Sequence, residues 1–329
     1  MATPPDVLPA QSVPDQPSPT RGRSAGDGSA LDDFAEARIV ARRKPGQWTA
    51  AAVALLLAAM VVGSVIRNDA FQWDVVGAWF TARSVLDGLA LTLWLTGLTL
   101  GLGFVLGTVL ATMRLSGNPV LRTLSWTYIW IFRSTPPLVQ LLFFFNIGAL
   151  YPTLGLGIPF GPEFLTVKTV NLFGPTLTAV IGLTLLETAY AAEVIRGGIL
   201  SVDRGQLEAA SALGLGRWRV LRRIVVPQAM RAIVPTAGNM LIGALKNTSI
   251  VSVLAVSDLL YSVQLVYLQS YQVIPMLMVA TLWYLVVTTV LSVGQYYVER
   301  HFAKGATREG LPPTPLQRTR AALRRAVKA

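Results

Sequence analysis

The chain has 329 residues, of which 14% are charged and 53% are hydrophobic, whereas roughly 25% of the residues in an average soluble domain are charged. This balance argues against nearly every water-soluble enzyme of that length. The absence of cysteine and the presence of one histidine, His301, exclude disulfides, thiol nucleophiles and Cys/His metal sites. The net charge of +11 gathers in the tails and in one internal segment between long apolar runs, so the sequence predicts an integral membrane protein.

The chain opens with a polar stretch followed by an apolar run. Residues 1–46 are rich in Pro, Ser and Asp and poor in aromatic side chains, so we expect a disordered tail. The next run, 48–66, carries no charge and is long enough to cross a hydrocarbon layer about 30 Å thick. Because this run exceeds the core of a cleavable signal peptide, we expect 47–66 to be a retained first membrane helix.

Five further apolar runs are predicted to span the membrane. The second of them holds Arg133 and the pair Pro136-Pro137, which predicts a break into two helical pieces with Arg133 capping the freed carbonyl groups. Small residues recur at a spacing of four, as in Gly97 with Gly101 and Gly103 with Gly107, and such positions let helix backbones approach closely. The five runs are 84–113, 124–150, 173–200, 233–261 and 275–298.

The basic residues orient these spans. Arginines concentrate in 201–232 and in the tail 299–329, whereas the segments on the opposite side carry few. By the positive-inside rule, this asymmetry predicts an all-α bundle of about six membrane helices with both termini in the cytoplasm. We interpret the basic tails as orientation signals and contacts to membrane lipid, and not as arms that bind nucleic acid.

The interior segment 201–232 has a distinct pattern. Residues 206–213 form a short helical run, Gly214 stands where a helix can end in the left-handed conformation, and 217–230 form a basic helical run. Arginines surround the apolar positions of the second run, so this helix is expected at the membrane face. The residues alone therefore predict an interior docking element: a short helix, a sharp turn and a basic helix that returns to the membrane.

This segment also resembles a known motif. Glu208-Ala209-Ala210, three residues, Gly214, nine residues, Ile224, two residues and Pro227 match the EAA loop of ATP-binding cassette (ABC) importer permeases at every defining position. The resemblance implies that this loop couples the chain to separate cytoplasmic ATPase subunits. The chain has no Gly-Lys dipeptide and hence no phosphate-binding loop of its own, so we expect a non-catalytic subunit without cofactor or metal, with ATP bound by its partners.

Three other segments resemble the polar amino acid permeases within that family. They are RSTPPLVQ at 133–140, AYAAEVIRGGI at 189–199 and LKNTSIVS at 245–252, and the resemblance covers 84–298. It implies a multi-pass protein of the bacterial plasma membrane that imports histidine, glutamate, glutamine, arginine or opines. It further implies an extracytoplasmic solute-binding protein, cytoplasmic ATP-binding subunits and a second permease chain, either identical or related.

Four residues are candidates for the substrate pathway: Glu187, Tyr190, Glu193 and Lys246. An ionisable residue inside a span costs roughly 2.5–3.5 kcal/mol, so it normally faces the bundle interior or water. Glu187, where the family usually has a small polar pair, either meets a cationic group of the substrate, pairs with Lys246, or lies near the outer boundary. Glu193 either forms a surface pair with Arg196 or acts in packing or gating. Lys246 either extends to the interface, pairs with a carboxylate, or contacts substrate.

The alternative function is a secondary transporter or channel for a small polar solute. Such a protein is expected to show internally repeated halves, broken helices and several carboxylates inside the membrane. No internal repeat is evident, and Glu187 is the one carboxylate that the sequence places clearly within a span. A membrane-anchored interaction protein without transport would leave Glu187, Lys246 and the small-residue spans unexplained.

Overall fold

The computed structural model describes residues 45–157, 163–169 and 173–302. The contacts divide the chain into two compact units, 1–64 and 65–329, and each is described by itself. The expected tail 1–46 lies outside the described residues except for its last two positions. The expected tail 299–329 lies outside them after Phe302.

The first unit is formed by helix α2 (Pro45–Arg67), which continues into the first residues of the second unit. Its apolar side chains are exposed around the whole helix, including Leu55, Leu57, Met60 and Val61. A helix that is apolar on every side needs an apolar solvent, which the hydrocarbon layer supplies. The helix occupies the position of the expected first membrane helix, and Thr49–Arg67 is long and apolar enough to cross a membrane.

The second unit begins with the short elements η1 (Asp69–Phe71) and α3 (Trp73–Phe80), followed by the long helix α4 (Arg83–Leu115). The end of α3 is fixed by Trp283, whose ring stacks on Phe80 at 4.6 Å between centroids and whose Nε1 donates to the Phe80 carbonyl at 2.8 Å. This contact ties α3 to the C-terminal helix α14 (Val273–Phe302).

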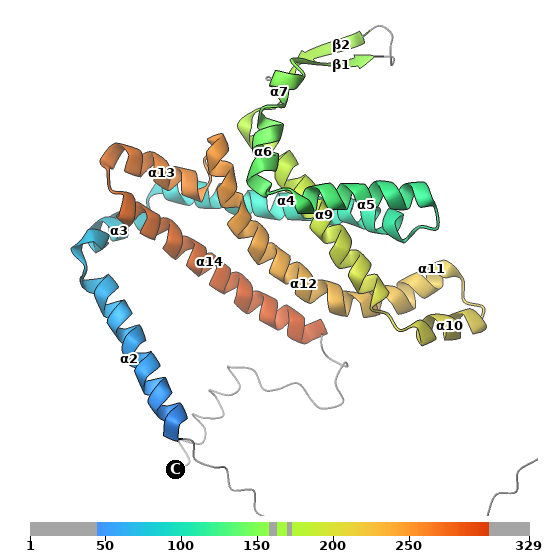
Figure 1. Cartoon of the computed structure of the whole chain (residues 1–329), viewed down its shortest axis with the longest axis horizontal. Coiled ribbons are helices and arrows are strands. Elements are labelled where there is room, and N and C mark those ends of the chain that lie inside the picture. The colour runs from blue at the N-terminus through green and yellow to red at the C-terminus, as the bar shows by residue number, and fades with distance from the viewer. Residues whose placement is uncertain (1–44, 158–162, 170–172, 303–329) are drawn as a thin grey trace, which may run out of the picture. The chain divides into compact units, whose positions relative to one another are not determined.

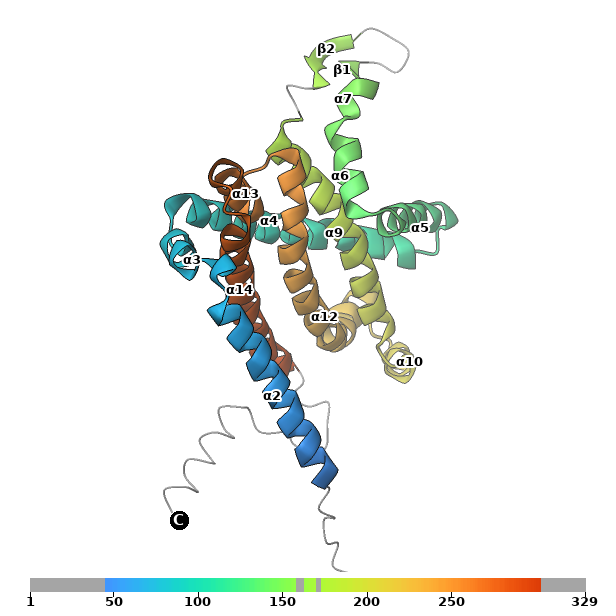
Figure 2. The same ribbon diagram turned by 60° about the vertical axis from the view of Figure 1, so that its left-hand side comes forward.

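The expected break at the proline pair is confirmed. Helix α5 (Pro119–Ser134) ends there, and α6 (Pro137–Phe145) turns away from it in both views of the ribbon (Figures 1 and 2). The prediction that Arg133 caps the freed carbonyl groups is wrong. The Gln140 side chain does so instead, because its Nε2 donates to the carbonyls of Phe132 and Thr135 at 2.9 and 2.8 Å.

A short hairpin that the sequence analysis did not predict follows α6 and α7 (Ile147–Leu150). Strands β1 (Thr153–Gly157) and β2 (Glu163–Lys168) pair antiparallel, with Thr153 opposite Lys168 and an irregularity between Leu156 and Gly157. The rest of the described chain is almost entirely helical, which confirms the all-α class.

The second half of the bundle is a series of helices separated by short breaks. The expected span 233–261 is not one straight helix: Ala255 adopts a φ of 58°, and Asp258 caps a new helix by accepting from Tyr261 N at 2.9 Å. The elements are α9 (Pro175–Leu200), α10 (Arg204–Ala212), α11 (Arg217–Val220), the π-turn η2 (Leu221–Val225), α12 (Val226–Asn247), η3 (Thr248–Leu254), α13 (Leu259–Ser270) and α14.

The number of spans differs from the expected six. Within the described ranges, four helices are long and apolar enough to cross a membrane: Thr49–Arg67, Arg83–Leu115, Pro175–Leu200 and Val273–Phe302. A fifth is added if Arg217–Leu254 and Leu259–Ser270, bent by 45°, count as one broken span. The remaining expected span, 124–150, is divided by its prolines into pieces that are each too short to qualify alone.

Two of the buried clusters of the second unit involve helix α4. One joins α4, α13 and α14, and its fully buried members include Val85, Leu259 and Met276. The other lies where α6, α9 and η3 meet the middle of α4, around Leu95 and Leu141. Helix α4 contributes to both clusters, so it serves as the common support for the helices of both halves.

Helices α4 and α9 approach each other closely at two glycines of α4. A Cβ atom at Gly103 would lie 2.8 Å from the Cβ of Glu187, and one at Gly107 would lie 2.8 Å from the Cβ of Ala191. The expected close approach is thus confirmed for this pair of glycines. At Gly97 and Gly101 an added Cβ would meet nothing within 4 Å in the described chain, so for this pair the close approach stays a prediction. Successive helical residues are about 100° apart, so residues 101 and 103 point to nearly opposite sides of α4.

We predict that Gly107→Ala destabilises the bundle by about 1–3 kcal/mol, because the added methyl group overpacks a contact that includes the Ala192 backbone nitrogen at 2.9 Å. Gly101→Ala is the matched control, with the same chemical change on the open side of the same helix. The denaturation midpoint of the purified protein in mild detergent measures both. Equal midpoints for the two variants would contradict the proposed packing.

Candidate functional site

The segment between α9 and α12 forms a helix, a tight turn and a second helix. Asp203 caps α10 by accepting from Gly205 N at 2.6 Å. At the other end Gly214 adopts a φ of 69°, with its N–H donating to Ser211 O at 3.0 Å and the N–H of Leu215 donating to Ala210 O at 3.1 Å. This pair of bonds is a Schellman motif, which requires a residue that tolerates positive φ. The prediction that α10 ends at Gly214 in the left-handed conformation is therefore confirmed.

This helix–turn–helix is anchored on the ends of α9 and α12. Val202, Val225 and Ala229 form a buried cluster, against which Leu207 of α10 and Val220 of α11 pack. Ala210 is buried as well. The segment is consequently held by packing from both of its helices, and Figure 1 shows α10 and α11 beyond the ends of α9 and α12.

The opposite side of the segment is exposed. Glu208 and Ala209 are exposed, and two large apolar side chains, Leu213 and Trp218, are 77% and 71% exposed. The arginines of α11 and η2 are exposed too, as expected for a basic helix at a membrane face. The segment thus offers small, acidic and apolar groups on one side while its other side is fixed.

The remaining two positions of the motif lie in the helix that returns to the bundle. Ile224 is half-buried in η2, and Pro227 lies in the first turn of α12. Proline has no N–H to donate to the carbonyl four residues earlier, here that of Arg223. The helix widens just before Pro227 into the single π-helical turn η2. All six residues of the predicted loop, from Glu208 to Pro227, thus belong to one continuous structural segment.

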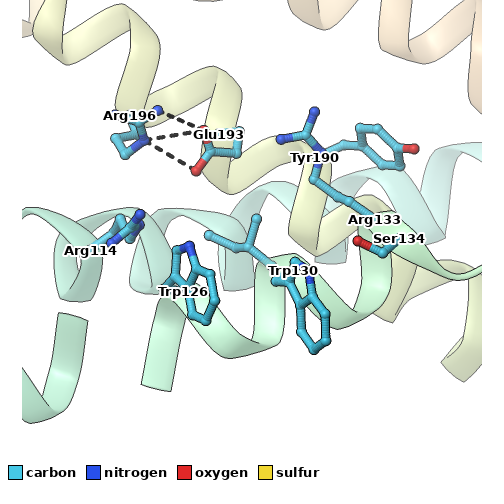
Figure 3. Close-up of a pocket in the computed structure, with 9 residues that line it drawn as sticks. Arg114, Trp126, Trp130, Arg133, Ser134, Tyr190, Glu193 and Arg196 are labelled. Atoms are coloured by element: carbon cyan, nitrogen blue, oxygen red, sulfur yellow. Dashed lines mark hydrogen bonds and ion pairs between the residues drawn. The ribbon is translucent and has the colours of Figure 1, made fainter. Parts of the chain in front are cut away.

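A cavity of about 380 Å³ lies between α4, α5 and α9 (Figure 3). Arg196 donates to Glu193 through two nitrogens, with Nη2 2.7 Å from Oε2 and Nε 3.1 Å from Oε1. The Arg133 guanidinium lies over the Tyr190 ring, 5.3 Å from its centroid. The lining consists of Arg114, Trp126, Ile129, Trp130, Arg133, Ser134, Tyr190, Glu193 and Arg196.

A second cavity of about 360 Å³ lies on the α12 side of α9 and shares Arg133, Tyr190 and Glu193 with the first. Small residues complete its lining, among them Gly197, Gly198 and Ala232. Tyr190 and Glu193 therefore lie between two cavities of different character, one with three arginines and two tryptophans, the other with small side chains.

The other two predicted pathway residues lie elsewhere. Glu187 is 4% exposed and packs against Gly103 in the contact between α4 and α9. Lys246, near the end of α12, is exposed. Both belong to the described chain, and no ion pair joins them, so the structure gives no support to a Glu187–Lys246 pair. The structure brings Tyr190 and Glu193 together and leaves Glu187 and Lys246 apart from them.

Sequence reasoning missed the polar group at the start of α13. Asp258 is fully buried; one carboxylate oxygen caps the helix and the other, Oδ2, has no hydrogen-bond partner in the described structure. An aspartate immediately before an apolar run is a helix-start signal, which the sequence analysis did not use. Arg114, Trp126 and Trp130 were likewise not predicted as site residues, because their convergence depends on how α4 and α5 pack.

The comparisons with known proteins agree with this architecture. Residues 103–304 match the family described as "binding-protein-dependent transport system inner membrane component". An arginine transport system permease protein of Corynebacterium glutamicum is 46% identical over 268 residues, which cover 81% of this chain and 83% of that protein. An L-cystine transport system permease protein of Bacillus subtilis is 37% identical over 58% of this chain and 75% of its own length.

Solved structures give the same result. An amino acid ABC transporter crystallised with histidines superposes with a TM-score of 0.57 and 31% identity, covering 66% of this chain and 94% of the other. The MetNI methionine ABC transporter, with a TM-score of 0.52 and 19% identity over 67% of this chain and 96% of its own, shares the fold. Neither comparison supports the alternative of a secondary transporter or channel. The chain therefore belongs to the family of binding-protein-dependent transport system inner membrane components, the non-catalytic, membrane-spanning permease subunits of ABC importers.

Proposed function

We propose that this permease imports a polar amino acid, with arginine the first candidate because the arginine permease is 46% identical. In this proposal ATP is bound by separate cytoplasmic subunits, a second permease chain completes the pathway, and a solute-binding protein delivers the cargo outside. The transport core is 84–298, with the cytoplasmic coupling loop at 201–232. The helix at 47–66 and the tails 1–46 and 299–329 are additions to that core.

The observation that carries the proposal is the anchored helix–turn–helix between α9 and α12. Transmission of force from an ATPase requires an element that moves as one piece with the membrane helices. Leu207 and Val220 pack on the cluster of Val202, Val225 and Ala229, so a displacement of α10 displaces the ends of α9 and α12 as well. A flexible linker without these contacts would absorb the displacement.

The exposed side of the loop has the chemistry of a docking surface. Glu208 and Ala209 leave room for close approach by a partner, and the exposed side chains of Leu213 and Trp218 provide apolar area to bury. Large exposed apolar residues flanking a small-residue surface favour a protein partner seated on α10. The ATPase subunit is the partner that this family requires.

The proposed cargo pathway runs along α9 on the side facing α12. The cavity lined by Tyr190, Glu193 and small residues lies there. Glu187, which is closer to the start of α9, is covered by α4 in this conformation. In an alternating-access cycle, a shift of α4 relative to α9 would expose Glu187 to the cargo, and Lys246 of α12 would lie further along the same route.

We predict that Gly214→Asp retains membrane insertion but lowers ATP-driven uptake about tenfold or more. A side chain at a φ of 69° costs roughly 1–2 kcal/mol, and the added charge falls on the proposed docking surface. Gly216→Asp is the control, since Gly216 is the N-cap of α11 at a φ of −62°, where aspartate is favoured. The measurement is amino acid uptake into proteoliposomes containing the whole transporter. Normal uptake by Gly214→Asp would count against the coupling role.

We further predict that Glu187→Gln reduces arginine uptake relative to glutamine uptake about tenfold, because a hydrogen bond to a charged partner contributes about 1.5–3 kcal/mol. Asp87→Asn is the control, because it makes the same chemical change at an exposed position of α4, where Asp87 Oδ2 lies 3.8 Å from Arg83 Nε. This variant should leave the ratio of arginine to glutamine uptake unchanged. Competition uptake with both amino acids gives the ratio directly. An unchanged ratio in Glu187→Gln would remove Glu187 from the pathway.

A further inference from the structure

The cavity between α4, α5 and α9 has a positive lining that the transport proposal does not use. It carries three arginines, Arg114, Arg133 and Arg196, and one carboxylate, Glu193. The carboxylate is already occupied, because Arg196 donates to both of its oxygens. The charges of Arg114 and Arg133 are therefore not neutralised by an ion pair within the described chain.

These two guanidinium groups are available to an anion. Arg133 is held over the face of Tyr190, a contact that fixes its position without neutralising its charge. The Nε of Arg114 is buried and has no hydrogen-bond partner in the described structure. A guanidinium group binds phosphate or carboxylate oxygens through two parallel hydrogen bonds, so both groups suit a compact anion with several acceptor oxygens.

The cavity is placed at a membrane surface. Arg114 lies in the last turn of α4, and Arg196 lies one turn before the end of α9. The orientation predicted from the basic residues puts both helix ends at the cytoplasmic face. Basic pockets between membrane helices at that face are typical sites for anionic lipid headgroups.

Two tryptophans form the open side of the cavity. Trp126 and Trp130 stack with their ring centroids 6.0 Å apart and are 48% and 57% exposed. Figure 3 shows both rings projecting from α5, with Arg114 on the side of Trp126 and Arg133 on the side of Trp130. Tryptophan is enriched at the boundary between headgroups and acyl chains, where its ring contacts hydrocarbon and its N–H contacts polar groups.

We propose that this cavity binds the phosphate of an anionic phospholipid from the cytoplasmic leaflet, with Arg114 and Arg133 as ligands and Trp126 and Trp130 against the lipid. The phosphate shares its chemistry with the carboxylate of an amino acid. The lipid is the better match, because the three arginines of the lining repel a cationic cargo and because the cavity opens past exposed tryptophans. The second cavity, on the α12 side, shares Arg133 with it but has neither Arg114 nor Arg196 in its lining. The proposal depends on the membrane placement and not on the identity of the cargo.

The test measures how much lipid stays bound to the whole transporter. The transporter is purified with its ATPase subunits, and its bound lipid is exchanged for phosphatidylglycerol. Native mass spectrometry should find phosphatidylglycerol on the wild type and on Arg122→Gln, an exposed arginine of α5 outside the cavity lining. Arg114→Gln should lower the apparent affinity about tenfold or more, because the charge-assisted hydrogen bonds of its guanidinium group are lost. Equal retention by the two variants would overturn the proposal.

Two further experiments separate loss of lipid binding from loss of assembly, and a lipid phosphate from the carboxylate of a free amino acid. If Arg114→Gln fails to co-purify with the ATPase, Trp130→Ser replaces it, with the same expected loss of lipid. Excess free glutamate or arginine should leave the bound phosphatidylglycerol in place. Displacement by a free amino acid would show that the cavity takes the cargo carboxylate and would overturn the lipid assignment. Neither arm uses uptake as its measurement, so a failure here leaves the transport proposal standing.

Discussion

The close approach of α4 and α9 is the contact on which the rest of the structure depends. It exists because Gly103 and Gly107 present no side chain to α9, so the backbones meet at a distance that even one methyl group would prevent. In hydrocarbon this packing has no hydrophobic driving force, and close van der Waals contact must stabilise it instead. Helix α4 then supports both buried clusters, and α9 is fixed along the length that carries Glu187, Tyr190, Glu193 and Arg196.

Helix α9, which packs against α4 in this conformation, connects three features that are separate in the sequence. Its middle is buried against α4, its last two turns form the wall between the two cavities, and its end leads into the anchored loop through Val202. A displacement of α10 would move the C-terminal end of α9, and with it Glu193 and Arg196. Coupling between the loop and the cavities therefore needs no chain of intermediate side chains, only a helix that moves as a rigid body.

The sequence predicted those parts of the fold that depend on local patterns. The turn at Gly214, the break at Pro136-Pro137 and four of the membrane helices follow from glycine, proline and apolar runs, which act through a few neighbouring residues. It did not predict features that depend on packing between distant segments. Glu187 lies against Gly103, and Gln140 replaces Arg133 as the cap. Arg114 and Arg133 line one cavity only because α4 and α5 pack side by side.

The two glycine pairs of α4 show why such features escape a single sequence. Gly97–Gly101 and Gly103–Gly107 have the same spacing and the same apolar surroundings, yet among the described residues only the second pair meets another helix. The spacing determines that two small residues share one face of a helix, but it carries no information about which face is occupied. That choice follows from the direction in which α9 crosses α4, which depends on every contact of the bundle at once. Within the described chain, α4 therefore packs its Gly103–Gly107 face against α9, while its Gly97–Gly101 face contacts no other helix.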